Sequence, residues 1–130
     1  MLTYQETIRF HGHNGPFLAL GYKFGKFLRQ KLKPRGIMDL KITVSTILKK
    51  PYTCLIDGLQ CATTATMGKG NIIAKKQRGK CILVSVQKNK KVYNYKIKDK
   101  AIEICLGKGD LEKLANKIFR TNPDELWKRI

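Results

Sequence analysis

Residues 15–33, GPFLALGYKFGKFLRQKLK, carry the clearest helical pattern in the chain. Apolar side chains recur here at steps of three and four, which predicts a helix with one buried face. They are Phe17, Leu20, Phe24, Leu28 and Leu32. Pro16 suits the first helical turn, where no backbone donor is missed, and Asn14 is expected to cap it. Gly21 and Gly25 lie one turn apart, so a second backbone is expected to approach this helix closely.

On either side of this helix the pattern alternates between further helices and strands. Residues 40–48, LKITVSTIL, place alternate side chains on one face, as a half-buried strand does. The other expected elements are a short helix in residues 1–10, a helix over 53–64, hairpin strands over 80–87 and 92–97, a helix from Asp110 and a short helix over 122–127, while 101–106 fit a helix or a strand. This order predicts an α+β fold in which helices pack against a small mixed sheet. At 130 residues, the chain is expected to form a single domain, 1–130.

The charge balance of the chain is strongly basic. Lys and Arg number 27 against 9 Asp and Glu, a formal net charge of +18, so many cations remain even if every acid is paired. This excess predicts a field that attracts anions such as a nucleic acid, a polyanionic cofactor or an acidic protein. The sequence has no long apolar run and no signal-like N-terminus, which favours a cytoplasmic protein without a membrane partner.

The four cysteines are Cys54, Cys61, Cys81 and Cys105. Their spacing excludes a zinc knuckle and the closely spaced run that holds an iron–sulfur cluster. Disulfides are not expected in the absence of a secretory signal. Cys81 and Cys105 lie within apolar runs, and we expect both to pack as small buried hydrophobes.

The two histidines of the chain are candidate metal ligands. His11-Gly12-His13 places two imidazoles on either side of a glycine, in a break before the helix at 15–33. Both rings can point at one ion, and neutral imidazole is the commonest metal ligand in proteins. The alternative is that one ring caps a helix end and the other has no role.

A second candidate cluster lies on the helix expected over 53–64. Cys54, Asp57 and Cys61 fall on one helical face, with Gln60 beside them. A thiolate and a carboxylate on one stripe can complete a metal site, or Cys54 can act as a nucleophile with a histidine as its base. The alternative is that this face points into the core.

The third cluster is the glycine-rich stretch Gly68-Lys69-Gly70-Asn71. Exposed amides next to an ammonium group suit an oxyanion, although the stretch is much shorter than a Walker A loop. A structural turn is the alternative interpretation.

These three clusters together resemble one known family. Residues 11–16, HGHNGP, followed by 18–22, LALGY, are similar to the opening of the FmdE family, which is named after formylmethanofuran dehydrogenase. Residues 54–60, CLIDGLQ, and 66–71, TMGKGN, resemble the later blocks of that family in the same order and at similar spacing. The likeness runs from about residue 9 to residue 86.

The resemblance implies an α+β fold with a mixed sheet, similar to that of FmdE proteins and to the glyceraldehyde-3-phosphate dehydrogenase domain-like fold. It also implies a homodimer and a bound divalent metal, often zinc, near the His-Gly-His turn. Members occur in archaea and anaerobic bacteria, and some are associated with the molybdenum or tungsten enzyme that makes or oxidises formylmethanofuran. The redox chemistry of that enzyme belongs to other polypeptides, so neither an iron–sulfur cluster nor a pterin is expected in this chain.

The resemblance also assigns roles to individual residues. The implied metal ligands are His11, His13 and Cys54, with Cys61 as a substitute ligand. Asp57 and Gln60 are implied to orient these ligands, and Asp57 can instead act as a general base. Lys69, Gly70 and Asn71 are implied to bind an anionic group. Where the family usually has two further cysteines, this chain has Gly15 and Ala65, and residues 1–130 contain no stretch that resembles the family's cysteine-rich C-terminal extension.

Two functions of different classes follow. The first is a zinc-binding, FmdE-like accessory protein, in a larger dehydrogenase complex or outside one, which acts on an anionic small molecule. The second is a non-catalytic basic module with a decayed metal site, whose hairpin face at 75–100 binds nucleic acid or other anions. Tyr93 and Tyr95 share one face of that hairpin, where they either stack on bases or, as is usual for aromatics in sheets, pack in the core.

Overall fold

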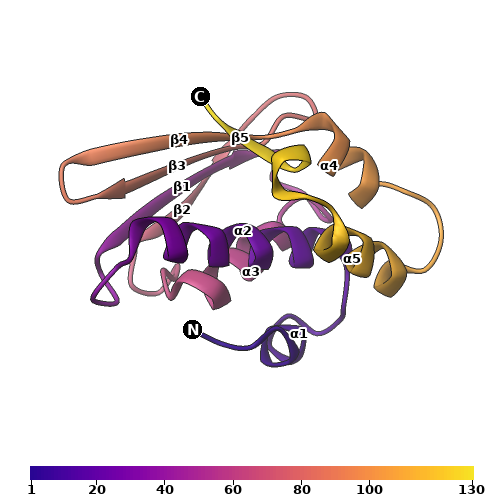
Figure 1. Ribbon diagram of the computed structural model, residues 1–130, viewed down its shortest axis with the longest axis horizontal. Coiled ribbons are helices and arrows are strands. Elements are labelled where there is room, and N and C mark those ends of the chain that lie inside the picture. The colour runs from indigo at the N-terminus through magenta and orange to yellow at the C-terminus, as the bar shows by residue number, and fades with distance from the viewer.

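The helix expected over 15–33 is α2 (Pro16–Leu32), which lies beneath a five-stranded sheet in the computed structural model of residues 1–130 (Figure 1). In chain order, the other elements are α1 (Tyr4–His11), β1 (Leu40–Thr46), α3 (Cys54–Thr63), β2 (Ile72–Lys76), β3 (Leu83–Lys88), β4 (Lys91–Ile97), α4 (Asp99–Cys105), α5 (Leu111–Arg120), the 3-10 helix η1 (Pro123–Glu125) and β5 (Trp127–Arg129). The fold is therefore α+β, as the order of the sequence patterns predicts. None of the helices has the length and apolar character needed to cross a membrane.

The sheet is mixed, with strand order β2-β1-β3-β4-β5. β1 and β2 are parallel, and the other neighbouring pairs are antiparallel. In β1 the alternate residues Leu40, Ile42, Val44 and Thr46 are buried, as the pattern predicts, but the strand ends at Thr46 and Leu48 is exposed, so the pattern is confirmed only over 40–46. α2, α3 and α5 lie on one side of the sheet (Figure 1). The buried faces of the strands pack with these helices in one hydrophobic core.

α2 and α3 pack with almost no space between their backbones. A Cβ atom on Gly21 would lie 2.0 Å from the carbonyl oxygen of Leu55, and one on Gly58 would lie 2.3 Å from that of Leu18. The close approach expected at Gly21 is therefore confirmed. Further along, Gly25 of α2 faces Ala62 of α3. Residue numbers therefore increase in the same direction along both helices, so the two helices run parallel. The N-terminal end of α3 consequently lies beside the N-terminal end of α2.

The prediction that Asn14 caps the N-terminus of α2 is wrong. The residue before Pro16 that occupies the cap position is Gly15, and it makes no side-chain cap hydrogen bond. The Oδ1 atom of Asn14 instead accepts a hydrogen bond from the hydroxyl of Tyr4 at 2.6 Å. This bond fastens the loop before α2 to α1, a contact that a local capping rule cannot anticipate because it joins residues ten positions apart.

The C-terminal segment also differs from the expected short helix over 122–127. The Oδ1 atom of Asn122 does cap the turn by accepting from the amide of Asp124, but the helix is 3-10 and ends at Glu125. Trp127 then begins β5, because its ring packs on Phe24 and Phe27, with ring centroids 4.9 and 5.3 Å away. This burial outweighs the local helical pattern.

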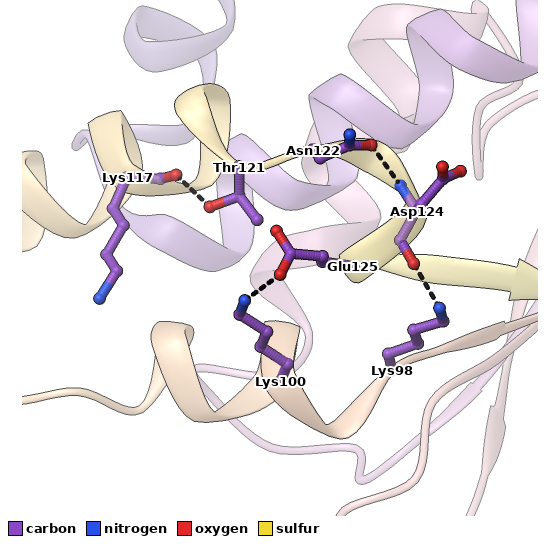
Figure 2. A network of polar contacts seen from close by, with 7 residues as sticks. All are labelled: Lys98, Lys100, Lys117, Thr121, Asn122, Asp124 and Glu125. Carbon is purple, nitrogen blue, oxygen red and sulfur yellow. Dashed lines mark hydrogen bonds and ion pairs between the residues drawn. The ribbon is translucent and has the colours of Figure 1, made fainter.

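The same segment is joined to α4, the element for which the sequence left helix and strand open. Lys98 donates to the carbonyl oxygen of Asp124, and Lys100 forms an ion pair with Glu125 (Figure 2). Both lysines lie at the start of α4, so these contacts hold η1 against the first turn of that helix.

Candidate metal centre

His11, His13 and Cys54 come together at the N-terminal ends of α2 and α3. One ligand atom from each lies within 4.8 Å of the other two, and the two imidazole ring centroids are 4.6 Å apart. His11 is the last residue of α1, whereas Cys54 is the first residue of α3. The parallel packing of α2 and α3 is what brings the thiol to the histidine turn.

Two glycines shape the turn that carries the histidines. Gly12 ends α1 in the left-handed conformation, with φ of 107°, and its amide donates to the carbonyl of Ile8. Such a conformation is easy for glycine and strained for other residues. A Cβ on Gly15 would lie 3.2 Å from Cε1 of His13, so the glycine leaves room for that ring.

A chain of hydrogen bonds fixes the orientation of His11. Its Nδ1 atom lies 2.6 Å from Oδ2 of Asp57, and Oδ1 of Asp57 accepts from the side-chain amide of Gln60 at 3.2 Å. Oε1 of Gln60 in turn accepts from the backbone amide of Met67 at 2.8 Å. The glycine-rich turn and the imidazole are therefore connected through two side chains of α3.

The residues present fit a metal ion. Because the Asp57 carboxylate accepts the proton on Nδ1 of His11, the lone pair of that ring is on Nε2. Nε2 is buried and has no hydrogen-bond partner, which is costly for a polar atom. The His11 side chain is only 10% exposed, so water does not readily satisfy it. Two imidazoles and one thiol match the ligand set of zinc.

The geometry therefore brings the first two motif blocks together at the metal centre and connects the third to it through Gln60. A family model described as "FmdE, Molybdenum formylmethanofuran dehydrogenase operon" matches residues 10–128. This chain belongs to the FmdE family. The matched range contains all three blocks and extends beyond residue 86, through α5. A search of curated proteins found no match to this chain.

The other cysteines of this FmdE-family chain lie outside the three-residue group. Cys61 is buried on α3, where burial raises the pKa of its thiol and a hydrogen bond with Thr7 partly offsets that rise. Burial likewise raises the pKa of Cys54, and the carboxylate of Asp57 adds to the effect. Cys105 is buried, as expected, with its pKa raised to about 12, but Cys81 is only half-buried, so the burial expected for it is wrong.

The predicted anion-binding stretch is a turn whose polar groups have partners within the FmdE fold. The ammonium of Lys69 donates to the carbonyl of Thr64, the C-terminal cap of α3, and to the hydroxyl of Thr66. The Asn71 side chain is buried; its Oδ1 accepts from the Thr66 amide, and its Nδ2 donates to the carbonyls of Ile37 and Leu40. Gly70 supplies a positive φ of 77°. Anion binding by these residues stays a prediction.

Proposed function

We propose that this FmdE-family protein binds one zinc ion through His11, His13 and Cys54. The observation that carries the proposal is the buried Nε2 atom of His11, which has no partner within the chain and belongs to a group of three ligand atoms. Three protein ligands are the number found in catalytic zinc sites, where the fourth position is open to water or substrate. A zinc ion in such a site acts as a Lewis acid on a carbonyl group or lowers the pKa of a bound water.

In this proposal Asp57 and Gln60 fix the tautomer and the orientation of the His11 imidazole. Asp57 keeps the proton of His11 on Nδ1, which presents Nε2 to the ion, and Gln60 holds Asp57 in place. Cys61 is not needed as a ligand. The Asp57 side chain is about a third exposed, at 34%, so it is also accessible as a general base for a reacting group.

The wider role proposed is that of an accessory component related to formylmethanofuran dehydrogenase, in the cytoplasm. The family description, which names a molybdenum formylmethanofuran dehydrogenase operon, supports this role. We further propose a homodimer that joins a larger dehydrogenase complex, with the redox cofactors held by other polypeptides. An anionic small molecule is the substrate class proposed for the zinc site.

The test of the zinc site is metal content per chain in protein purified without a histidine tag. We expect close to one zinc per chain in the wild type and a loss of most of it in Cys54→Ser. Cys81→Ser is the matched control, because Cys81 is also a free cysteine but lies outside the three-residue group. Wild-type protein that stays free of metal after zinc is supplied, or equal zinc in both variants, would contradict the proposal.

The hydrogen bond from Asp57 to His11 is expected to tune metal affinity. Removing such an outer partner typically weakens metal binding by about 10- to 100-fold, so Asp57→Ala should show a loss of this size in competition with a zinc chelator. Asp99→Ala changes the net charge equally at an exposed position of α4 and should bind zinc like the wild type. An Asp57→Ala affinity equal to that of the control would mean that the carboxylate does not support the site.

A further inference from the structure

The charge of this protein is distributed very unevenly along the chain. Residues 7–98 contain twenty Lys and Arg but only two acids, Asp39 and Asp57, whereas residues 99–130 contain seven Lys and Arg and six acids. The segment that forms α4, α5 and β5 is therefore nearly neutral. The excess charge belongs to the rest of the molecule, which includes α2 and the β3–β4 hairpin.

Ion pairs do not neutralise this excess. One pair joins a lysine to a carboxylate, Lys100 with Glu125, and it lies in the nearly neutral C-terminal segment (Figure 2). The other pair is His11 with Asp57 at the metal centre. Asp39, the remaining acid of the basic part, accepts hydrogen bonds from the backbone amides of Gly36 and Arg35, which lower the pKa of its carboxyl group, and the charges of Lys88 and Arg35 lower it further.

Several basic residues gather around a groove at the far end of α2 from the metal centre. This tip groove has a volume of about 550 Å³ and is lined by Lys31 from α2 and by Lys88, Lys90, Lys91 and Tyr93 from the β3–β4 hairpin. α2 has 17 residues, so the groove is about 25 Å from the histidine turn.

No acidic side chain lines the tip groove. Lys88 and Lys91 are direct cross-strand partners, and like charges in such positions repel. The ammonium of Lys88 turns to the carbonyls of Leu32 and Lys33 at the end of α2, which fixes one side of the groove. Lys90 and Lys91 are exposed, and neither forms an ion pair within the chain.

An aromatic ring lies among these cations. Tyr93 is half-buried and lines the groove, with the guanidinium of Arg129 4.8 Å from its ring centroid. Tyr95, two residues further on, is 2% exposed and packs on Phe24, so this tyrosine is in the core, as is usual for sheet aromatics. Tyr93 also packs against the core, but of the two tyrosines it is the one that is not fully buried.

We propose that the tip groove binds single-stranded nucleic acid, with phosphates on Lys31, Lys90 and Lys91 and one base against the Tyr93–Arg129 pair. A basic groove with an aromatic platform is the arrangement by which proteins bind single strands without strong sequence preference. A duplex keeps its bases stacked and offers none to Tyr93. This inference goes beyond the zinc site and does not depend on it.

The experiment measures fluorescence anisotropy with a labelled oligothymidylate of about 12 nucleotides, a length within the usual site size. We expect the triple variant Lys31→Gln/Lys90→Gln/Lys91→Gln to bind at least about tenfold more weakly. The slope of log affinity against log salt concentration should be smaller in magnitude by about 2, because each of the three lost phosphate contacts contributes about 0.7 to that slope. Lys88 is left unchanged because its ammonium has a structural role.

The matched control is Lys108→Gln/Lys113→Gln/Lys117→Gln, which removes the same charge from exposed positions in and before α5. It should bind like the wild type, as should the His11→Ala/His13→Ala variant, which tests the zinc site separately. An abasic strand of equal length should bind more weakly than oligothymidylate. If both triple variants lose the same affinity for oligothymidylate, the binding site is not the tip groove. If duplex DNA, the abasic strand or inorganic polyphosphate binds as tightly as oligothymidylate or more tightly, the groove does not select single-stranded nucleic acid.

Discussion

The His11→Ala/His13→Ala variant is expected to purify without zinc and to lose the thermal stabilisation that the metal gives the wild type. Binding to the folded state alone at a ligand concentration of 100 times Kd stabilises by about 2.7 kcal/mol, which corresponds to a rise in Tm of roughly 8 °C for a chain of this size. The wild type should therefore melt at a lower temperature after treatment with a chelator. The double variant should melt at one temperature with or without it.

The control for this prediction is Phe10→Ala, which changes an exposed neighbour on α1 and leaves all three ligands in place. Its response to the chelator should equal that of the wild type. Circular dichroism of the metal-free proteins checks that the double variant is folded. A chelator-dependent Tm that survives in the double variant would show that the ion is held elsewhere in the chain.

Gly21→Ala is expected to cause a large loss of stability. The new Cβ would lie 2.0 Å from the carbonyl oxygen of Leu55, so α2 and α3 must separate. Overpacking of a core typically costs about 1–3 kcal/mol, and contact with a backbone atom places this site at or above the upper end. The urea unfolding midpoint should fall accordingly, and zinc binding should weaken because the separation moves Cys54 away from the histidines.

Gly68→Ala is the matched control, since a Cβ there has no atom within 4 Å and its φ is not positive. This substitution should leave the free energy of unfolding within about 1 kcal/mol of the wild-type value. If Gly21→Ala is too unstable to purify while Gly68→Ala is obtained normally, the prediction is met. Equal unfolding midpoints for the two variants would contradict the prediction, because they would show that α2 and α3 leave room for a methyl group at residue 21.

The parts of the fold that depend on local pattern could be predicted from the sequence. The apolar stripe of α2 and the alternation in β1 each follow from a single short stretch, because side-chain periodicity reflects which face of one element is buried. β2 and β5 could not be found in this way. β5 has three residues, and it exists because Trp127 packs on α2, a contact between segments about a hundred residues apart.

The ligand types, the shared helical face of Cys54, Asp57 and Cys61, and the excess of positive charge can all be read from the sequence. That Cys54 joins the histidines while Cys61 lies beside Thr7 depends on how the helices pack. Helical spacing places the thiols of Cys54 and Cys61 on one face of α3. The glycine contacts between α2 and α3 then determine that the Cys54 end of this face lies next to the histidine turn. The tip groove has the same origin, since Lys88 meets the end of α2 across 56 positions of sequence. Such long-range contacts depend on how whole elements pack, and no local pattern records that.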